Sequence, residues 1–412
     1  MRLYKAKIIL IVSILTICNI QPTYAITNAV PAAEGLAVKV YSSANNCTGA
    51  IWLNYIVITA AHCVVLPSGV VANSIGVSAF VSGQWIKSEV AGVKLPKNYT
   101  GGKLDIYGQS FDYDIAFLIL KNKLWDYSLF PNLRIANATD WETYKTSQTS
   151  LEEFGYGFTT ESSSETPTKA PVSAMFYLDV ALSSGPKDWA VMHSNTSSSC
   201  RGDSGGPVIY YRQAENALVL VGILSNSTGP GQCGSFQFGS STSVFTKLSS
   251  YADLAASTLN TASKYQTTAK VLNTAYENLD GYKTNNSDLS DFADQLPLST
   301  KKRVFDNNKN VAALYILTED YENKINDYQE ILDQSMDFTF INSGILEANS
   351  PAVGSNFEVS LNPFETKINA LLKKIAKVLP SAVCTNDLQT KDLPSSKKCP
   401  KGYTKKELTK PF

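Results

Sequence analysis

Between Gly35 and about Lys247, apolar residues come in short runs that glycine-rich turns separate. Ile56–Ile58 and Ala116–Leu120 are such runs, and Ala217–Leu224 leads into a polar segment that contains glycine and proline. Runs of this length between turn residues are typical of strands rather than helices. Many short strands over about two hundred residues predict an all-β barrel domain.

Beyond Tyr251 the pattern changes, because apolar positions now recur every three or four residues and glycine becomes scarce. This change marks a domain boundary. Two stripes follow the spacing of one helix face. They are Leu259, Ala262, Tyr265, Ala269, Leu272, Tyr276 and Leu279, and then Val311, Leu314, Thr318, Tyr321, Ile325, Tyr328 and Leu332. Together they predict an antiparallel helical hairpin or a small bundle.

A third helix is expected from Pro363 to Val378, with Pro380 ending it. Its apolar side is formed by Ile368, Leu371, Leu372 and Ile375, and its lysines lie elsewhere. Two interpretations stay open. The helix packs on the bundle as a surface helix, or it lies on an anionic membrane or polysaccharide as a basic amphipathic helix.

The first 25 residues have the pattern of an export signal. Arg2, Lys5 and Lys7 precede an apolar run from Ile8 to Ile17, and Thr23-Tyr24-Ala25 then has small residues where signal peptidase needs them. The apolar run is too short to cross a bilayer comfortably. We therefore expect cleavage after Ala25 and a secreted, extracellular protein, or a periplasmic one if the source is a Gram-negative bacterium.

Length and charge narrow the function classes. A chain of 412 residues is long enough for two folded units, or for one unit with a long appendage. Its 36 basic and 36 acidic residues cancel, so nothing in the overall charge favours a nucleic-acid partner.

The cysteines indicate an oxidising compartment. Removal of the signal also removes Cys18 and leaves six cysteines, which suggests three disulfides. They are Cys47, Cys63, Cys200, Cys233, Cys384 and Cys399. None of these forms a close pair with the spacing of a zinc site, and the chain has only two histidines. We expect neither a metal nor another cofactor.

Hydrolysis of a peptide bond needs a nucleophile, a base, an orienting group for the base, and donors to the oxyanion. The segment from Gly202 to Pro207 sets Ser204 among glycines, which allow a strained loop whose N–H groups point at a substrate oxygen. Alone, such a segment is only suggestive.

Three motifs in order resemble the chymotrypsin-like serine protease family: Thr59–Cys63, Asp114–Leu118 and Cys200–Pro207. The resemblance covers residues 26 to about 255 and implies two six-stranded antiparallel β-barrels, followed here by an α-helical C-terminal region. It implies a triad in which His62 is the general base, Asp114 orients it, and Ser204 is the nucleophile. The N–H groups of Gly202 and Ser204 would form the oxyanion hole.

The residues agree with this assignment. Asp112 and Asp105 lie near Asp114, but the apolar run begins directly after Asp114, which places that aspartate best at the start of a buried strand. The other histidine, His193, is expected in a loop beside the specificity pocket, without a catalytic role.

The resemblance also implies two disulfides, Cys47 with Cys63 and Cys200 with Cys233. Cys384 and Cys399 then remain to close a loop in the tail. Family members are activated when a new N-terminal ammonium binds the aspartate before the nucleophile, here Asp203. Cleavage after Ala25 would expose Ile26 directly, so we expect activation by signal removal without a zymogen stage.

For the substrate pocket, the resemblance assigns Ser198 to the base and Ser225, Ser227 and Ser243 to the surrounding wall and backbone-pairing segment. An aspartate at the position of Ser198 would mark a trypsin-like enzyme. The expected pocket is polar and uncharged, and without a buried carboxylate strict cleavage after lysine or arginine is not expected.

The sequence thus predicts a signal peptide (1–25), a protease domain (26–258), a helical region (259–380) and a lysine-rich tail closed by a disulfide (381–412). The expected function is that of a secreted serine endopeptidase acting on proteins or peptides. The alternatives are a catalytically silent homologue that serves as a binding or adhesion module, and a helical region that inhibits or chaperones the protease. The helices are also candidates for docking a protein, a cell surface or a membrane surface.

Overall fold

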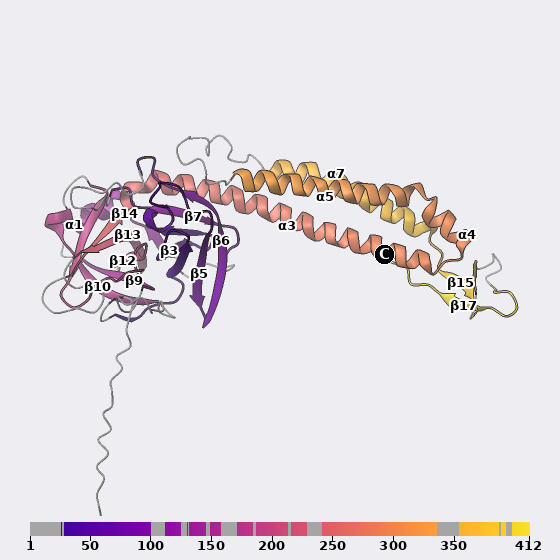
Figure 1. The fold of residues 1–412 in the computed structure, drawn as a ribbon, viewed down its shortest axis with the longest axis horizontal. Coiled ribbons are helices and arrows are strands. Elements are labelled where there is room, and N and C mark those ends of the chain that lie inside the picture. The colour runs from indigo at the N-terminus through magenta and orange to yellow at the C-terminus, as the bar shows by residue number, and fades with distance from the viewer. Residues whose placement is uncertain are drawn as a thin grey trace, which may run out of the picture.

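The computed structural model describes residues 26, 29–99, 112–124, 130, 132–145, 149–157, 171–183, 187–212, 216–228, 241–335, 354–386, 389–392 and 398–412. The expected signal peptide (1–25) lies outside these residues. Two β-barrels form a globular body, and a long helical arm extends from it to a small sheet at the far end (Figure 1). We call residues 252–378 the helical arm and residues 382–412 the tip.

The first barrel closes from six antiparallel strands, paired in the order β2-β3-β4-β7-β6-β5. The strands are β2 (Ala37–Ser42), β3 (Asn46–Leu53), β4 (Ile56–Thr59), β5 (Ile75–Val81), β6 (Gln84–Lys94) and β7 (Ala116–Leu120). All four residues of β4 and all five of β7 are buried, which is why both read as continuous apolar runs in the sequence. A short 3-10 turn, η1 (Ala61–Cys63), follows β4 directly.

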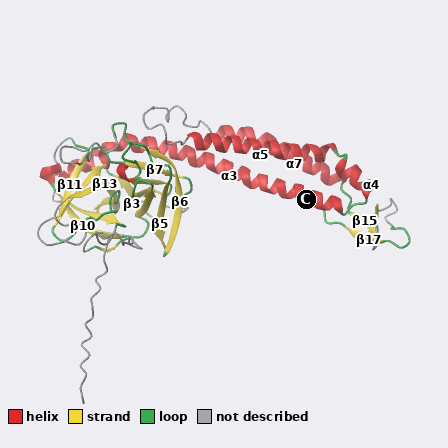
Figure 2. Cartoon of the chain, in the orientation of Figure 1, coloured by secondary structure: helices red, strands yellow, loops and turns green. Residues whose placement is uncertain are grey.

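The second barrel also has six antiparallel strands, in the order β10-β11-β14-β13-β12-β9, and the pairing of β9 with β10 closes it (Figure 2). They are β9 (Ser150–Gly155), β10 (Val172–Leu178), β11 (Trp189–Ser194), β12 (Pro207–Arg212), β13 (Ala217–Thr228) and β14 (Ser241–Lys247). Two short strands are added outside the ring, β1 (Val30–Pro31) on β10 and β8 (Leu133–Ile135) on β13. The expected pair of six-stranded barrels is confirmed.

Short helices complete this body: α1 (Ala138–Lys145), α2 (Val180–Ser183) and the turn η4 (Leu248–Tyr251). The two barrels are joined through Thr48 of β3. Its hydroxyl donates to the carbonyl oxygen of Gly202 at 2.9 Å and accepts from the N–H of Tyr156 at 3.0 Å. Its own N–H donates to the carbonyl oxygen of Ser204 at 2.9 Å. The first barrel thereby holds the Ser204 loop, which belongs to the second.

The helical arm consists of α3 (Ala252–Asp294), α4 (Leu298–Lys301), the π-helical turn η5 (Lys302–Asp306), α5 (Lys309–Ser335) and α7 (Gly354–Val378). With 43 residues, α3 is about 65 Å long at 1.5 Å per residue. It begins at Ala252, inside the region expected to belong to the protease domain, and joins body and arm as one continuous helix. Its Gln266 amide donates to the carbonyl oxygen of Leu120 in β7 at 2.9 Å.

The three long helices form an up-down-up bundle. Asn286 of α3 donates to Thr318 of α5, and Tyr276 of α3 donates to Asn326, so these two helices run antiparallel. Asn278 of α3 donates to Glu365 of α7. The apolar core of the bundle lies between the three helices. That core is formed by Leu272, Leu289, Leu314, Tyr321, Ile325, Leu332, Leu361, Ile368 and Ile375.

The expected start of the third helix at Pro363 is wrong, because α7 begins at Gly354 and contains Pro363 in its interior. Packing on α5 explains the extension. Phe357 stacks on Tyr328 with ring centroids 3.9 Å apart, and Leu361 is buried. These contacts hold the segment before Pro363 helical although proline removes one backbone hydrogen bond.

The tip is a three-stranded antiparallel sheet in the order β16-β15-β17. Its strands are β15 (Ala382–Thr385), β16 (Thr390–Asp392) and β17 (Thr404–Glu407), and a disulfide joins Cys384 to Cys399. Of the helices among the described residues, none combines the length and apolar character needed to cross a membrane.

Candidate active site

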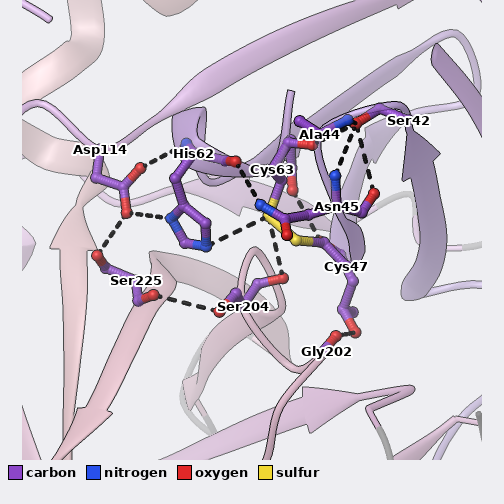
Figure 3. Close-up of a disulfide and its surroundings, with 12 residues drawn as sticks. Ser42, Ala44, Asn45, Cys47, His62, Cys63, Asp114, Gly202, Ser204 and Ser225 are labelled. Carbon is purple, nitrogen blue, oxygen red and sulfur yellow. Dashed lines mark hydrogen bonds and ion pairs between the residues drawn. A yellow bond between two sulfur atoms is a disulfide. The ribbon is translucent and has the colours of Figure 1, made fainter. Parts of the chain in front are cut away.

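A histidine and an aspartate meet at the junction of the barrels (Figure 3). His62 lies in η1 at the end of β4, and Asp114 lies just before β7, which pairs with β4. The Nδ1 of His62 is 2.8 Å from Oδ2 of Asp114, and the backbone N–H of His62 donates to Oδ1 at 3.0 Å. Two bonds to one carboxylate fix both the ring and the backbone of the histidine.

Asp114 is enclosed by further donors. The hydroxyl of Ser225, in β13, donates to Oδ2 at 2.5 Å, and the hydroxyl of Thr246 donates to the carbonyl oxygen at 3.0 Å. Burial alone would raise the pKa of Asp114, but the His62 charge and the hydrogen bonds from His62 and Ser225 hold this pKa below its usual value. The carboxylate therefore stays ionised.

The same pair sets the protonation of the histidine. Burial lowers the pKa of His62, but the charge and the hydrogen bond of Asp114 outweigh it, so the pKa lies above 6.5. The side chain of His62 is 37% exposed, whereas that of Asp114 is 5% exposed. An imidazole with one face open and a buried carboxylate behind it is suited to exchange a proton with a bound molecule.

Ser204 lies across from His62 in a tight loop before β12 (Figure 3). Its hydroxyl donates to the carbonyl oxygen of Ser225 at 3.3 Å, and among the described residues it makes no hydrogen bond to His62. Two backbone hydrogen bonds hold the loop. The N–H of Gly205 donates to the carbonyl oxygen of Leu224 at 2.7 Å, and the N–H of Gly206 donates to that of Asp203 at 2.9 Å. A side-chain rotation is needed to turn the hydroxyl from Ser225 toward the ring.

The loop also presents two backbone donors. Gly202 has φ of 92° and Gly205 has φ of 85°, a left-handed conformation that glycine adopts without strain. In the part of the chain that the structure describes, the N–H groups of Gly202 and Ser204 donate to no protein acceptor. Two unsatisfied amides beside a serine hydroxyl form a place where a developing negative oxygen would be stabilised.

Comparison with protein families assigns this architecture. The family model described as Trypsin matches residues 26–255, more than half of the chain. The chain belongs to the trypsin family. A comparison with curated protein sequences found no match. The helical arm beyond residue 255 lies outside the matched region, so the trypsin-family assignment concerns the two barrels and the first turn of α3.

Asp203, next to Ser204, is fully buried in the trypsin-family domain. Its Oδ2 accepts from the N–H of Cys200 at 2.7 Å and its Oδ1 from the N–H of Gly157 at 2.8 Å. Burial raises the pKa of Asp203 to about 7. A methyl group on Gly155 would lie 1.9 Å from this carboxylate, so the site requires glycine there. Ile26 is also completely buried, in the core of the second barrel.

The serines expected in the substrate pocket fall into two sets. Ser225 bridges Asp114 and Ser204: its hydroxyl donates to the first and its carbonyl oxygen accepts from the second. The others gather around Ser199: the hydroxyls of Ser227 and Ser198 both donate to its carbonyl oxygen, at 3.3 and 3.4 Å. The hydroxyl of Ser243 lies 2.7 Å from that of Ser199. Sequence reasoning missed Ser199.

A buried carboxylate next to Ser199 was missed as well. Glu153, in β9, accepts from the Ser199 hydroxyl at 2.8 Å and is fully buried. In the sequence its only signal is a charged residue in a position where β9 turns its side chains inward, between Leu151 and Phe154. A buried carboxyl group therefore lies next to Ser199, which contacts three of the serines expected in the pocket.

The cysteines flank the site. Cys47 and Cys63 form the expected disulfide, which ties β3 to the turn that carries His62. Cys200 is buried, and its expected partner Cys233 lies outside the described residues. Among the described residues, the group nearest to metal-ligand geometry is Cys47, His62 and Cys63. Two of its three sulfur and nitrogen donors are joined in the disulfide and offer no thiolate.

His193 lies in β11, where it pairs with Tyr177 of β10, and not in a loop. The expectation of a loop position was wrong because the strand extends through Ser194. Its ring lies 6.2 Å from that of Tyr177.

Proposed function

We propose that this trypsin-family chain is a serine endopeptidase that acts on proteins or peptides through Ser204, His62 and Asp114. One observation carries the proposal: the 2.8 Å contact between His62 and a buried, ionised Asp114, directly across from a serine in a glycine-rich loop. That contact favours the tautomer in which Nε2 carries no proton and can accept one. In the resting structure Nε2 lies 3.8 Å from Sγ of Cys63.

In the proposed reaction, Ser204 Oγ attacks the scissile carbonyl carbon while its proton passes to Nε2 of His62. The carbonyl oxygen becomes an oxyanion that the N–H groups of Gly202 and Ser204 stabilise. The proton on His62 then moves to the leaving amine, the C–N bond breaks, and an acyl-enzyme remains. Water repeats the sequence: it gives a proton to His62, attacks the ester carbonyl, and releases Ser204 and the acid product.

Ser225 supports this scheme in two ways. Its hydroxyl adds a second charge-stabilising hydrogen bond to Asp114, and its carbonyl oxygen holds the Ser204 hydroxyl in the resting state. The resting hydrogen bond is a neutral one at 3.3 Å, and such bonds contribute only about 1 kcal/mol. Rotation of Ser204 toward His62 therefore costs little compared with the barrier to hydrolysis.

We also propose that Ile26 and Asp203 form the activating pair. In the full chain the nitrogen of Ile26 is an amide, and the carboxyl of Asp203 is buried with a pKa near 7. A new ammonium at Ile26 would supply the cation that this carboxylate lacks. N-terminal sequencing of the active protein tests this: a mature chain beginning at Ile26 supports it, and one that begins elsewhere contradicts it.

An active-site phosphonate that reacts with nucleophilic serine tests the function itself. We expect stoichiometric labelling of the mature protein, loss of labelling in Ser204→Ala, and normal labelling in the control Ser250→Ala, an exposed serine outside the site. Labelling that persists in Ser204→Ala would refute the assignment of the nucleophile. A folded mature protein that takes no label would favour the alternative, a silent homologue that acts as a binding module.

For the rest of the chain, we propose export and a docking role of the helical arm toward a protein or a cell or membrane surface. The arm extends away from the barrels (Figure 1) and carries the lysine-rich tip at its end. A chain truncated after Thr268 would keep the part of α3 that contacts β7. Unchanged peptide hydrolysis together with lost surface binding would support docking, and a marked gain in hydrolysis would instead indicate an inhibitory arm.

A further inference from the structure

Asp188 is a carboxyl group that the proposed triad does not use, although it binds the backbone directly beside it. Asp188 lies just before β11 in the second barrel and is partly buried. Its Oδ2 accepts from the backbone N–H of Tyr113 at 2.7 Å and also from the hydroxyl of Tyr251. Tyr113 directly precedes Asp114 in the chain. A side chain of the second barrel therefore holds the backbone next to the triad aspartate of the first.

Tyr113 has a backbone conformation that a bulky residue keeps only when its surroundings hold it. Its φ is 63°, in the left-handed region that favours glycine. Two residues further on, the N–H of Ile115 donates to the carbonyl oxygen of Tyr113 at 2.8 Å and closes a three-residue turn with Asp114 at its centre. Strained backbone of this kind is concentrated at functional sites, where several contacts fix it at once. The turn sets the direction in which the side chain of Asp114 leaves the backbone.

Asp188 is itself fixed on two sides. Its carbonyl oxygen accepts from the N–H of Lys247 in β14 at 2.7 Å. Tyr251, which binds its carboxyl group, is buried, and burial together with the hydrogen bond to Asp188 raises the pKa of the tyrosine hydroxyl. That hydroxyl therefore keeps its proton and remains a donor. Thr246, the neighbour of Lys247, donates to the carbonyl oxygen of Asp114 at 3.0 Å, so the end of β14 holds Asp188 and Asp114 together.

The orientation of Asp114 decides how well it acts on His62. The Nδ1 of His62 is 2.8 Å from Oδ2 of Asp114, and the N–H of His62 donates to Oδ1 at 3.0 Å. Both contacts need one orientation of the carboxyl group, because its two oxygens bind different atoms of the histidine. If Tyr113 relaxed to an ordinary negative φ, the turn would change and the carboxyl group would move away from these atoms. A displacement of about 1 Å in a catalytic group can cost about a hundredfold in rate.

We propose that Asp188 is a positioning residue for peptide hydrolysis, which holds the left-handed turn at Tyr113 and thereby the orientation of Asp114 toward His62. The inference rests on the proposed protease function. Asp188 reaches the reacting atoms only through Tyr113 and Asp114, so its loss weakens the Asp114–His62 pair and leaves the groups that bind a peptide unchanged. Asp112, on the other side of Tyr113, has a different partner: its Oδ1 accepts from the indole N–H of Trp189 at 3.1 Å, outside the turn.

Steady-state hydrolysis of one peptide by the mature protein tests this, with kcat and KM measured across pH per site that the phosphonate titrates. For Asp188→Ala we expect kcat to fall about a hundredfold and KM to change less than about twofold. The midpoint of the acid limb of kcat/KM should fall below that of the wild type, because Asp114 raises the pKa of His62 and would be held less firmly beside it.

Two further variants show which property of Asp188 matters. Asp188→Asn keeps an oxygen that accepts from the N–H of Tyr113, and it should retain kcat within about fivefold of the wild type. The matched control is Asp112→Ala, which removes a carboxyl group equally close to Tyr113 along the chain. It should leave both kcat and the acid midpoint unchanged.

The outcomes separate this inference from the proposed function. A wild-type protein that takes no phosphonate label at Ser204 contradicts the function and the inference with it. If the wild type is labelled and Asp188→Ala keeps its kcat and acid midpoint, only the role of Asp188 is overturned. An Asp188→Asn variant as slow as Asp188→Ala also overturns it, because the hydrogen bond would then not be what matters. If Asp188→Ala fails to fold, Tyr251→Phe decides, since it removes the hydroxyl that fixes Oδ2: a lower kcat with a lower acid midpoint supports the proposal, and unchanged values refute it.

Discussion

The two barrels and the helical arm differ most in the polar groups that they bury. Among the described residues, every buried ionisable acid or base lies in the barrel body: Asp114, Asp140, Glu153, Asp203 and Lys247. The arm buries only neutral polar residues, namely Thr258, Thr268, Asn286, Thr300 and Thr318. The hydroxyls of Thr258, Thr268 and Thr318 each donate to the carbonyl oxygen four residues earlier in the same helix, Thr318 at 2.8 Å. The amide of Asn286 donates to Thr318.

This difference indicates that the arm is built for structure, whereas the barrels hold groups suited to chemistry. A helix satisfies its own backbone, so an apolar stripe with a few threonines is enough to build the arm. Buried charge is expensive and is retained where a counter-charge or a reaction requires it. Of the five ionisable groups, Asp140 has its partner in Arg134 at 2.8 Å. Asp114 contacts His62, and Asp203 directly precedes Ser204. We therefore expect the chemistry to depend on Asp114 and Asp203 and not on the arm.

The largest effect is expected for Asp114→Asn. The amide keeps the shape but cannot accept the Nδ1–H of His62 in the same way, so the wrong tautomer is favoured. We expect kcat to fall about 10⁴-fold, the loss typical of this change in a Ser-His-Asp triad. The control is Asp112→Asn, since Asp112 contacts Trp189 at 3.1 Å and not the triad. Steady-state hydrolysis of a peptide substrate measures both, and equal activity of Asp114→Asn and wild type would contradict the assignment.

A smaller but still large loss is expected for Asp203→Asn. If an ammonium at Ile26 pairs with this carboxylate, its removal leaves that cation buried alone, which costs about 3–5 kcal/mol and corresponds to at least a hundredfold loss of active protein. Asp140→Asn is the matched control, because it also removes a buried carboxylate, one in α1 that is ion-paired with Arg134. It should lower the melting temperature without lowering kcat/KM of the folded protein. Equal losses of kcat/KM in both variants would show that Asp203 serves stability only.

The pH dependence of activity comes next in size. Only neutral His62 accepts the proton of Ser204, so activity must rise with pH as His62 loses its proton. Because Asp114 raises the pKa of His62, the midpoint of this acid limb should lie above 6.5. In Asp114→Asn the residual activity should have a lower midpoint, since the stabilising charge is gone. A pH–rate profile of kcat/KM measures both midpoints; activity that is highest in acid would contradict His62 as the base.

The sequence allowed prediction of the parts that local pattern determines. Continuous apolar runs such as Ala116–Leu120 indicated buried strands, and the spacing of Tyr321 and Ile325 indicated a helix face. The positions of His62, Asp114 and Ser204 followed from three short motifs. Their prediction was possible because each motif lies at a fixed place relative to a strand or turn.

The remainder depends on contacts between distant segments. Glu153 and Ser199 lie in different elements, and nothing in either local pattern indicates that they meet. The hydroxyl of Ser225 reaches Asp114 only because β13 and β7 come together from two barrels. The early start of α7 at Gly354 reflects the packing of Phe357 on Tyr328, which outweighs the local signal of Pro363.

The smallest effect on chemistry is expected for a large defect in the arm. Ile325 of α5 is completely buried in the bundle core, and Ile325→Ala should destabilise the arm by about 2–5 kcal/mol through the cavity that it leaves. Ile58→Ala in β4 is the matched barrel variant: this residue is equally buried, but its strand leads directly to His62. We expect kcat/KM to stay within about twofold for Ile325→Ala and to fall clearly for Ile58→Ala, because mispositioned catalytic groups lose rate steeply. Calorimetry with peptide hydrolysis measures both quantities. A parallel fall of activity in Ile325→Ala would mean that strain in the bundle reaches the site along α3, whose Gln266 contacts β7, and the division between barrels and arm would then fail.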